Sequence, residues 1–394
     1  MYRRLISRIQ LHSPAQSQTL PGSSASPSKE TAGMTAFDQI PYRRWFPWLH
    51  LFRGIGIALS FRQLMVAAGA IGVLSLGQAI GEWVAPDVPA FAIDLEKKAI
   101  FVPSPSLRIR DVTSDALRFW DDTLHPAVAV VKNGNSSMGR LKSIVRCCWM
   151  IAVWSVFGLV LCRLAVRRFA RNEDGSLRKA IVFGTTRWIH AIVSPLLPGG
   201  AALAIMLVAV VTVLPGRLPW VGPTLALMAT PVVLLCSLVA AYLLIAILLG
   251  WPLMVAAIAT DDCDGFGGLS RSYSLWTGRP WYFAWCWMVA AFAGAVATLV
   301  ANWLTMIAFQ LSGLAIHLAA GSTPAAVSAD ATTCFVATLV LKMYGISFFW
   351  TSATIVYVLL RQSVDGMPLD GMAPDDDERP KREPLPVVGM PAMQ

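Results

Sequence analysis

Three aspartates in a short turn are the residues of this chain best suited to chemistry. Asp261, Asp262 and Asp264 stand in the run DDCD, between an apolar segment and a segment of mixed polarity. Asp-x-Asp pairs of this kind can bind a divalent cation. Because no further acidic or amide ligand is fixed nearby, we favour another interpretation, in which Asp264 caps the following helix and the other two carboxylates are solvated.

Two arginines flank the segment that follows this turn. Arg271 lies within it and Arg279 at its end, where Gly278 and Pro280 are expected to finish one helix and begin the next. Both guanidinium groups could hold lipid phosphates or a partner. They are explained equally well as topology signals on the basic side of a membrane, and both interpretations stay open.

Lys342 is a further candidate, because it is charged and lies inside the last long apolar run. A charge within a membrane-crossing segment is a functional candidate by default. In the alternative that we favour, the span begins near Lys342, whose side chain then reaches the outer surface. About 20 residues connect Lys342 to Arg361, which is enough to cross the hydrocarbon layer unaided.

Other catalytic signatures are missing from the sequence. The chain has no phosphate-binding glycine loop, no nucleophile elbow and no HExxH sequence. Most of the seven cysteines lie inside apolar runs and the five histidines are scattered, so neither a disulfide framework nor a metal site is predicted. We therefore predict no catalytic residue, no cofactor and no metal ion.

The composition indicates a membrane protein. Hydrophobic residues make up 56% of the 394 residues and charged residues only 14%, whereas a soluble domain carries about a quarter charged residues. The net charge of +9 comes mainly from Lys and Arg beside the apolar runs. At such positions basic residues set topology and contact head groups, so we expect the lipid bilayer as a partner and no nucleic acid.

Six apolar runs approach or exceed the roughly 20 residues that a bilayer-spanning helix needs. The predicted fold is therefore an all-α, polytopic transmembrane bundle, with amphipathic helices at the interface near 42–62, 177–193 and 265–277. Pro195 and Pro198 should separate the second of these from the third span, and Trp251-Pro252 should mark the exit of the fourth. The six runs lie near 64–80, 147–166, 199–214, 224–249, 281–307 and 335–360.

Polar segments complete the predicted organisation. The Ser- and Pro-rich residues 1–39 and the acidic, Pro-rich residues 362–394 should be disordered on either side of an integral membrane domain, 40–361. Residues 82–146 are expected to form a long loop on the outer side of the membrane. The basic residues Arg140, Lys142 and Arg146 argue against an outer position, because basic residues are usually retained on the cytoplasmic side. A second outer loop covers 310–330.

The basic residues also predict an orientation. The strongest cluster stands at and beyond the end of the second span, and another precedes the first span, so both termini are expected in the cytoplasm of a bacterial inner membrane. The two clusters are Arg163, Arg167, Arg168, Arg171, Arg178 and Lys179, and Arg43, Arg44, Arg53 and Arg62.

Four segments carry a family resemblance: RLAVRRFARNEDGSLRKAIVF, the Trp-Pro-Leu-Met of GWPLMVAAIAT, DGFGGLSRSYSLWTGRP and YVLLRQSVDG. In combination they resemble multi-span membrane proteins of bacteria, especially planctomycetes. The stretch GGLSRSYSLWTGRPW is also similar to a membrane-domain family attached to some glycerophosphodiester phosphodiesterases. The likeness covers roughly residues 142–366 and implies a membrane domain of six helices without an established activity. No phosphodiesterase domain accompanies it here, so that activity is not carried over.

Three functions are consistent with these features. The first is a non-enzymatic membrane protein that organises or assembles with membrane protein partners. The second is a transporter or a lipid-handling protein at the cytoplasmic leaflet, which the lack of any acid or histidine within the predicted spans makes less attractive, because proton-coupled transport uses such relays. The third is a membrane-embedded enzyme that uses the turn from Asp261 to Asp264.

Overall fold

The computed structural model describes residues 47–84, 137–321 and 323–366. Within these ranges the chain is all-helical, with eight α-helices and no strand. Two helices are short, and two 3₁₀ turns accompany the longer ones. The short elements are η2 (Pro47–Phe52), α2 (Arg53–Ala58), η3 (Leu214–Arg217) and α8 (Gly265–Gly278).

Six helices of the described chain are long and apolar enough to cross a membrane, which confirms the predicted number. Each contains one of the six apolar runs expected from the sequence, except that the last residue of the third run, Leu214, belongs to η3. The chain is therefore a multi-span membrane protein. The six are α3 (Phe61–Val84), α5 (Ser137–Ala170), α6 (Leu177–Val213), α7 (Gly222–Asp261), α9 (Pro280–Ala320) and α10 (Pro324–Asp365).

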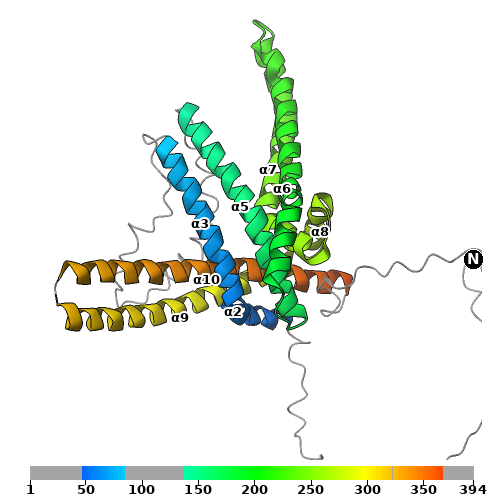
Figure 1. Ribbon diagram of the computed structural model, residues 1–394. Helices are drawn as coiled ribbons and strands as arrows, with labels where there is room; N and C mark the ends of the chain where they lie inside the picture. The colour runs from blue at the N-terminus through cyan, green and yellow to red at the C-terminus, as the bar shows by residue number, and fades with distance from the viewer. Residues whose placement is uncertain (1–46, 85–136, 322, 367–394) are drawn as a thin grey trace, which may run out of the picture. The chain divides into compact units, whose positions relative to one another are not determined.

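The long helices form three antiparallel pairs, α3 with α5, α6 with α7, and α9 with α10, and α5 also packs along α6. The C-terminal half of α10 joins the pairs, because α10 also contacts α2, α3, α5, α7 and α8. Figure 1 shows the outer parts of the α6–α7 and α9–α10 pairs lying beyond this region.

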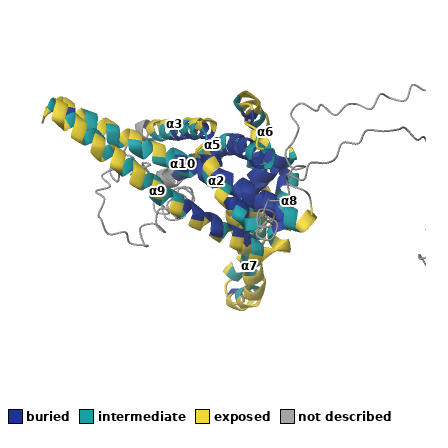
Figure 2. Cartoon of the chain, turned by 90° about the horizontal axis from the view of Figure 1, so that it is seen from below, coloured by how far each residue is buried: buried dark blue, intermediate teal, exposed yellow. Residues whose placement is uncertain are grey.

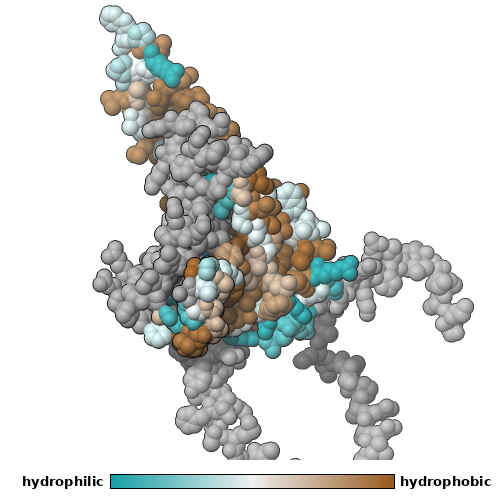
Figure 3. All heavy atoms as spheres, turned by 60° about the vertical axis from the view of Figure 1, so that its left-hand side comes forward, coloured by the Kyte–Doolittle hydropathy of each residue, from teal (hydrophilic) through white to brown (hydrophobic). Residues whose placement is uncertain are grey.

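The hydrophobic core lies where the three pairs meet. The core consists of the N-terminal parts of α3, α6 and α9 and the C-terminal parts of α5, α7 and α10. The chain therefore leaves the core along α3, α6 and α9 and returns to it three times, along α5, α7 and α10. Figure 2 shows buried residues at this meeting point and exposed ones along the far parts of the pairs. There the surface is largely apolar, as the brown atoms in Figure 3 show, with hydrophilic residues at its ends.

The predicted break at Pro195 and Pro198 is wrong, because α6 runs through both prolines. The expected interfacial helix near 177–193 and the third span near 199–214 are thus one helix. Proline removes one backbone hydrogen bond, and packing against neighbouring helices compensates in a membrane protein. Here α6 packs along both α5 and α7, and Pro198 is buried.

Two other predicted ends also lie inside helices. The fourth long helix continues past Trp251-Pro252 to Asp261, since residues 253–260 are fully enclosed by other helices. The outer loop expected at 310–330 is helical up to Ala320 and again from Pro324, because α9 and α10 pack on each other there. Thr323 caps α10 by accepting a hydrogen bond from the Ala326 N–H at 3.4 Å.

The boundaries of the first predicted loop and interfacial helix change as well. Residues 137–146 belong to α5 rather than to the loop expected at 82–146, and residues 85–136 lie outside the described chain. Of the interfacial helix near 42–62, residues 47–58 form η2 and α2, and Phe61 already begins α3. The predictions for residues 1–46 and 367–394 also fall outside the described residues.

Candidate functional site

The turn from Asp261 to Asp264 links two helices. Asp261 is the last residue of α7, and Asp262 ends that helix in the left-handed conformation, with φ 52°. Asp264 precedes α8, and its carboxylate accepts a hydrogen bond from the Gly267 N–H at 2.8 Å. The predicted helix cap at Asp264 is therefore confirmed. So are the predicted roles of Gly278 as the last residue of α8 and Pro280 as the first of α9.

The carboxylate of Asp261 is buried, so the prediction that it is solvated was wrong. Only 3% of its side chain is exposed. One oxygen accepts a hydrogen bond from the Tyr357 hydroxyl at 2.6 Å and pairs with Arg271, and the other pairs with Arg361. Asp261 thereby joins the end of α7 to α8 and to α10, whose packing excludes water from the carboxylate.

The neighbouring carboxylates have other partners. Asp262 pairs with Arg187 of α6 at 2.9 Å, and Asp365 lies 3.5 Å from Arg361 on α10. Because the three carboxylates of the turn point to separate partners, the geometry argues against the divalent-cation interpretation. The described residues contain no group of three His, Cys, Asp or Glu side chains that could hold a metal ion.

Arg163 adds α5 to this arrangement. Its side chain is buried, donates to the Ala259 carbonyl at 2.8 Å and lies over the Phe183 ring at 4.4 Å. Ala259 belongs to the last turn of α7, where carbonyls lack a partner within the helix. The sequence analysis counted Arg163 among the basic residues that set the membrane orientation, and it did not predict this contact. Arg163 lies before the end of the predicted span 147–166, and this position could have indicated a charge with a partner inside the protein.

The four segments from which a family resemblance was expected meet here. Arg163 comes from the first, Ala259 from the second, Arg271 from the third, and Tyr357 and Arg361 from the fourth. Asp261, which directly follows the second segment, connects the last two. The contacts hold α5, α7, α8 and α10 together at one end of the long helices.

Cys263 is the nucleophilic side chain closest in sequence to Asp261, and its environment does not activate it. Burial raises the pKa of the Cys263 thiol to about 11, so the group is protonated at neutral pH. A protonated thiol is a poor nucleophile. The turn therefore supplies ion pairs and a helix cap, without a nucleophile and base in contact.

The structure brings Arg271 to Asp261 but places the other two candidates elsewhere. Arg279 lies between α8 and α9 with an exposed side chain. Lys342 is partly buried in α10, about 28 Å along the helix from Arg361 at 1.5 Å per residue. It precedes the buried stretch that begins at Tyr344. Its depth in a bilayer remains a prediction.

A second polar contact, which sequence reasoning also missed, crosses the core between α3 and α10. The side-chain oxygen of Gln63 accepts hydrogen bonds from the hydroxyls of Ser347 and Thr351, both at 2.8 Å. All three residues are buried.

Comparison of the whole chain with known protein families, curated proteins and solved structures finds no match.

Proposed function

We propose that the protein is a non-enzymatic component of the bacterial inner membrane that assembles with membrane protein partners. The main observation in support of this proposal is that the side chains capable of chemistry are paired with one another. Asp261, Arg271 and Arg361 are engaged with one another across three helices. Such an arrangement stabilises helix packing, and it leaves the lateral surface of the helices as the part available for interaction.

α6 and α7 are the least buried of the six long helices. Only 11% of the most apolar stretch of α7 is buried within the protein, whereas 89% of the most apolar stretch of α10 is buried. Leu227, Leu234 and Leu238 are among the exposed side chains of α7. Lipid or a partner helix must cover these positions in the membrane.

Site-specific photo-crosslinking tests the proposal. A benzophenone amino acid at Leu234 should give a discrete protein adduct in native membranes, identifiable by mass spectrometry. The same probe at Leu253, which is fully buried, is the matched control and should react only within the chain. If probes at Leu234, Leu227 and the exposed α9 residue Leu304 form adducts with lipid alone, the assembly role is rejected.

We also propose that both termini face the cytoplasm. Two facts support this orientation: the chain returns to the core end three times, and the basic residues Arg163, Arg187, Arg271 and Arg361 gather at that end. Basic residues are retained on the cytoplasmic side. A cysteine at exposed Asn172 should resist an impermeant maleimide in intact cells, whereas one at Arg217 in η3 should react. The opposite labelling pattern would reverse the orientation.

The other two functions receive less support. A membrane-embedded enzyme at residues 261–264 would need a reactive group, and the pairing of these carboxylates provides none. Lipid handling at the cytoplasmic leaflet remains the second candidate, because a hollow lined by basic groups lies at the start of α3.

A further inference from the structure

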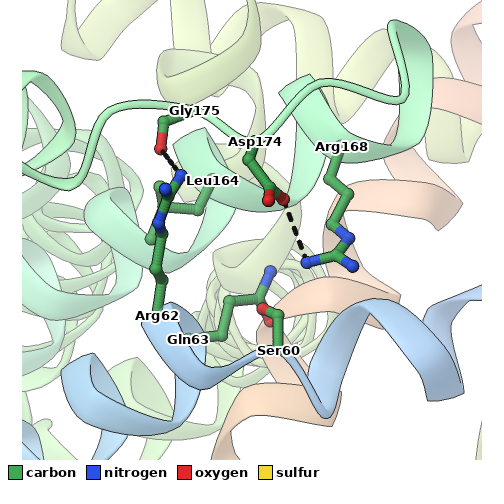
Figure 4. Close-up of a pocket in the computed structure, with 7 residues that line it drawn as sticks. All are labelled: Ser60, Arg62, Gln63, Leu164, Arg168, Asp174 and Gly175. Carbon is green, nitrogen blue, oxygen red and sulfur yellow. Dashed lines mark hydrogen bonds and ion pairs between the residues drawn. The ribbon is translucent and has the colours of Figure 1, made fainter.

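A small hollow lies between the start of α3, the end of α5 and the turn that leads to α6 (Figure 4). Its volume is about 10 Å³, which is about the space of one water molecule. Among the residues around it are Arg62 and Gln63 of α3, Arg168 of α5 and Asp174 of the turn. None of them belongs to the Asp261 contacts described above.

Gln63 provides a donor that needs an acceptor. Its side-chain oxygen is occupied by Ser347 and Thr351, which leaves the amide nitrogen to face the hollow. The residue is only 1% exposed, and this nitrogen has no hydrogen-bond partner among the described residues. A buried donor without an acceptor is costly, so the hollow is suited to a group with acceptor oxygens.

The charges around the hollow favour an anion over a neutral acceptor. Arg62 donates to the Gly175 carbonyl at 2.7 Å, so this bond leaves its positive charge unneutralised. Arg168 pairs with Asp174 at 3.1 Å. The lining of the hollow thus carries two guanidinium groups and one carboxylate. The first turn of α3 adds main-chain N–H groups that lack acceptors within the helix, and the positive end of its dipole.

Asp174 holds the position that an external anion would take. Figure 4 shows its carboxylate directed toward Arg168, above the amide of Gln63. The Asp174 side chain is 60% exposed and that of Arg168 is 38% exposed. An ion pair so open to water contributes little stability, so a stronger anion can displace Asp174 at low cost.

We propose that a phosphate group binds here, in the hollow together with the space that the Asp174 carboxylate vacates, and accepts hydrogen bonds from Arg62, Arg168 and the Gln63 amide. Bidentate arginine contacts and a helix N-terminus are the features that recognise phosphate in proteins. The site lies at the first residues of the α3 span, where a lipid head group or a soluble phosphate has access. This binding role goes beyond the assembly role proposed above and does not depend on it.

Binding is measured on the full-length protein purified in a neutral detergent. One arm titrates inorganic phosphate, and the other adds phosphatidylglycerol with neutral diacylglycerol as the reference, read by native mass spectrometry. We expect Gln63→Glu to weaken binding by roughly tenfold or more, because a donor to an anion becomes a repelling oxygen. Glutamate keeps the acceptor for Ser347 and Thr351. Asp174→Asn should strengthen binding, since it removes the competing charge.

Arg178→Gln is the matched control, because it removes an exposed positive charge of α6 that does not line the hollow. Binding of either probe that responds to Gln63→Glu and Asp174→Asn but not to Arg178→Gln supports the site, and the arm that responds identifies the source of the phosphate. Binding of neither probe, or equal binding by wild type and Gln63→Glu, overturns the proposal. If Gln63→Glu fails to fold, Asp174→Asn and Arg168→Gln decide by opposite shifts in affinity.

Discussion

The buried half of α10 and the outer half of α7 are both membrane-type helices, but they meet different surroundings. Residues 344–360 of α10 are enclosed by protein almost everywhere, whereas most of residues 224–239 of α7 remain exposed or half-exposed. The enclosed helix is the less apolar of the two. It carries the buried polar residues Ser347, Thr351, Ser352 and Thr354.

This difference reflects the two solvents of a membrane protein. A lipid-facing segment must be apolar, because hydrocarbon accepts no hydrogen bonds. A protein-facing segment can carry hydroxyls when neighbouring helices satisfy them, as Gln63 does for Ser347 and Thr351. Apolar character alone therefore indicates where a helix meets lipid better than where the protein core lies. The following four predictions test this contrast.

The largest effect should come from the core ion pairs. Asp261→Ala removes the acceptor of Tyr357 and the counter-charge of Arg361, whose side chain is only 14% exposed. Leaving a buried charge unpaired costs about 3–5 kcal/mol of unfolding free energy. Asp262→Asn is the control, because asparagine tolerates the left-handed backbone of this position. The pair of Asp262 with Arg187 is 47% and 34% exposed and should contribute at most about 1 kcal/mol. Equal losses in detergent unfolding assays would show that burial of Asp261 does not matter.

One substitution made twice on α7 compares the two surroundings directly. Leu253 is fully buried and Leu234 is 70% exposed. Leu253→Ala should lower the unfolding free energy by about 2–5 kcal/mol through the cavity that it leaves. Leu234→Ala should change it by less than about 0.5 kcal/mol. A comparable loss at Leu234 would indicate that a bound partner already covers this position in the purified protein.

Two glycines should respond in opposite directions to alanine. A Cβ at Gly158 of α5 would lie 2.8 Å from the ring of Trp350, which is fully buried on α10. Gly158→Ala should therefore destabilise the protein by about 1–3 kcal/mol. A Cβ at Gly72 of α3 meets nothing within 4 Å, so Gly72→Ala should stabilise the helix by about 0.5–1 kcal/mol. Thermal unfolding measures both, and stabilisation at Gly158 would contradict the close packing.

The smallest effect concerns the buried hydroxyls. Thr351→Val removes a hydrogen bond to Gln63 between α10 and α3 and should cost about 0.5–1.5 kcal/mol. In α9, Thr305 donates only to the Ala301 carbonyl of its own helix, at 2.8 Å. Because that bond joins no second helix, Thr305→Val should be close to neutral in the same unfolding assay. If Thr351→Val leaves the unfolding free energy unchanged, the hydrogen bond between Thr351 and Gln63 does not stabilise the core.

Local features of this protein could be predicted from the sequence. The six membrane-type helices follow from long runs of apolar residues, and the start of α8 follows from Asp264. Gly278 and Pro280 likewise mark the step from α8 to α9. Each of these features depends on residues close together in the chain, so composition and capping chemistry are sufficient to find them.

The predicted ends at Pro195, Pro198 and Pro252 failed for a different reason. Proline lowers the local preference for helix, but in α6 and α7 the surrounding helices restore it. Those neighbours come from other parts of the chain, so no local pattern reports them.

The character of the candidate site was decided only by tertiary structure. Asp261 appears in the sequence as one of three similar aspartates, yet it alone is buried against Arg361, 100 residues further along the chain. The sequence determined that this chain is a helical membrane protein, because that depends on the summed preference of residues for lipid. Which charges stabilise it depends on the approach of α8 and α10 to the end of α7, and such long-range packing is a property of the folded chain.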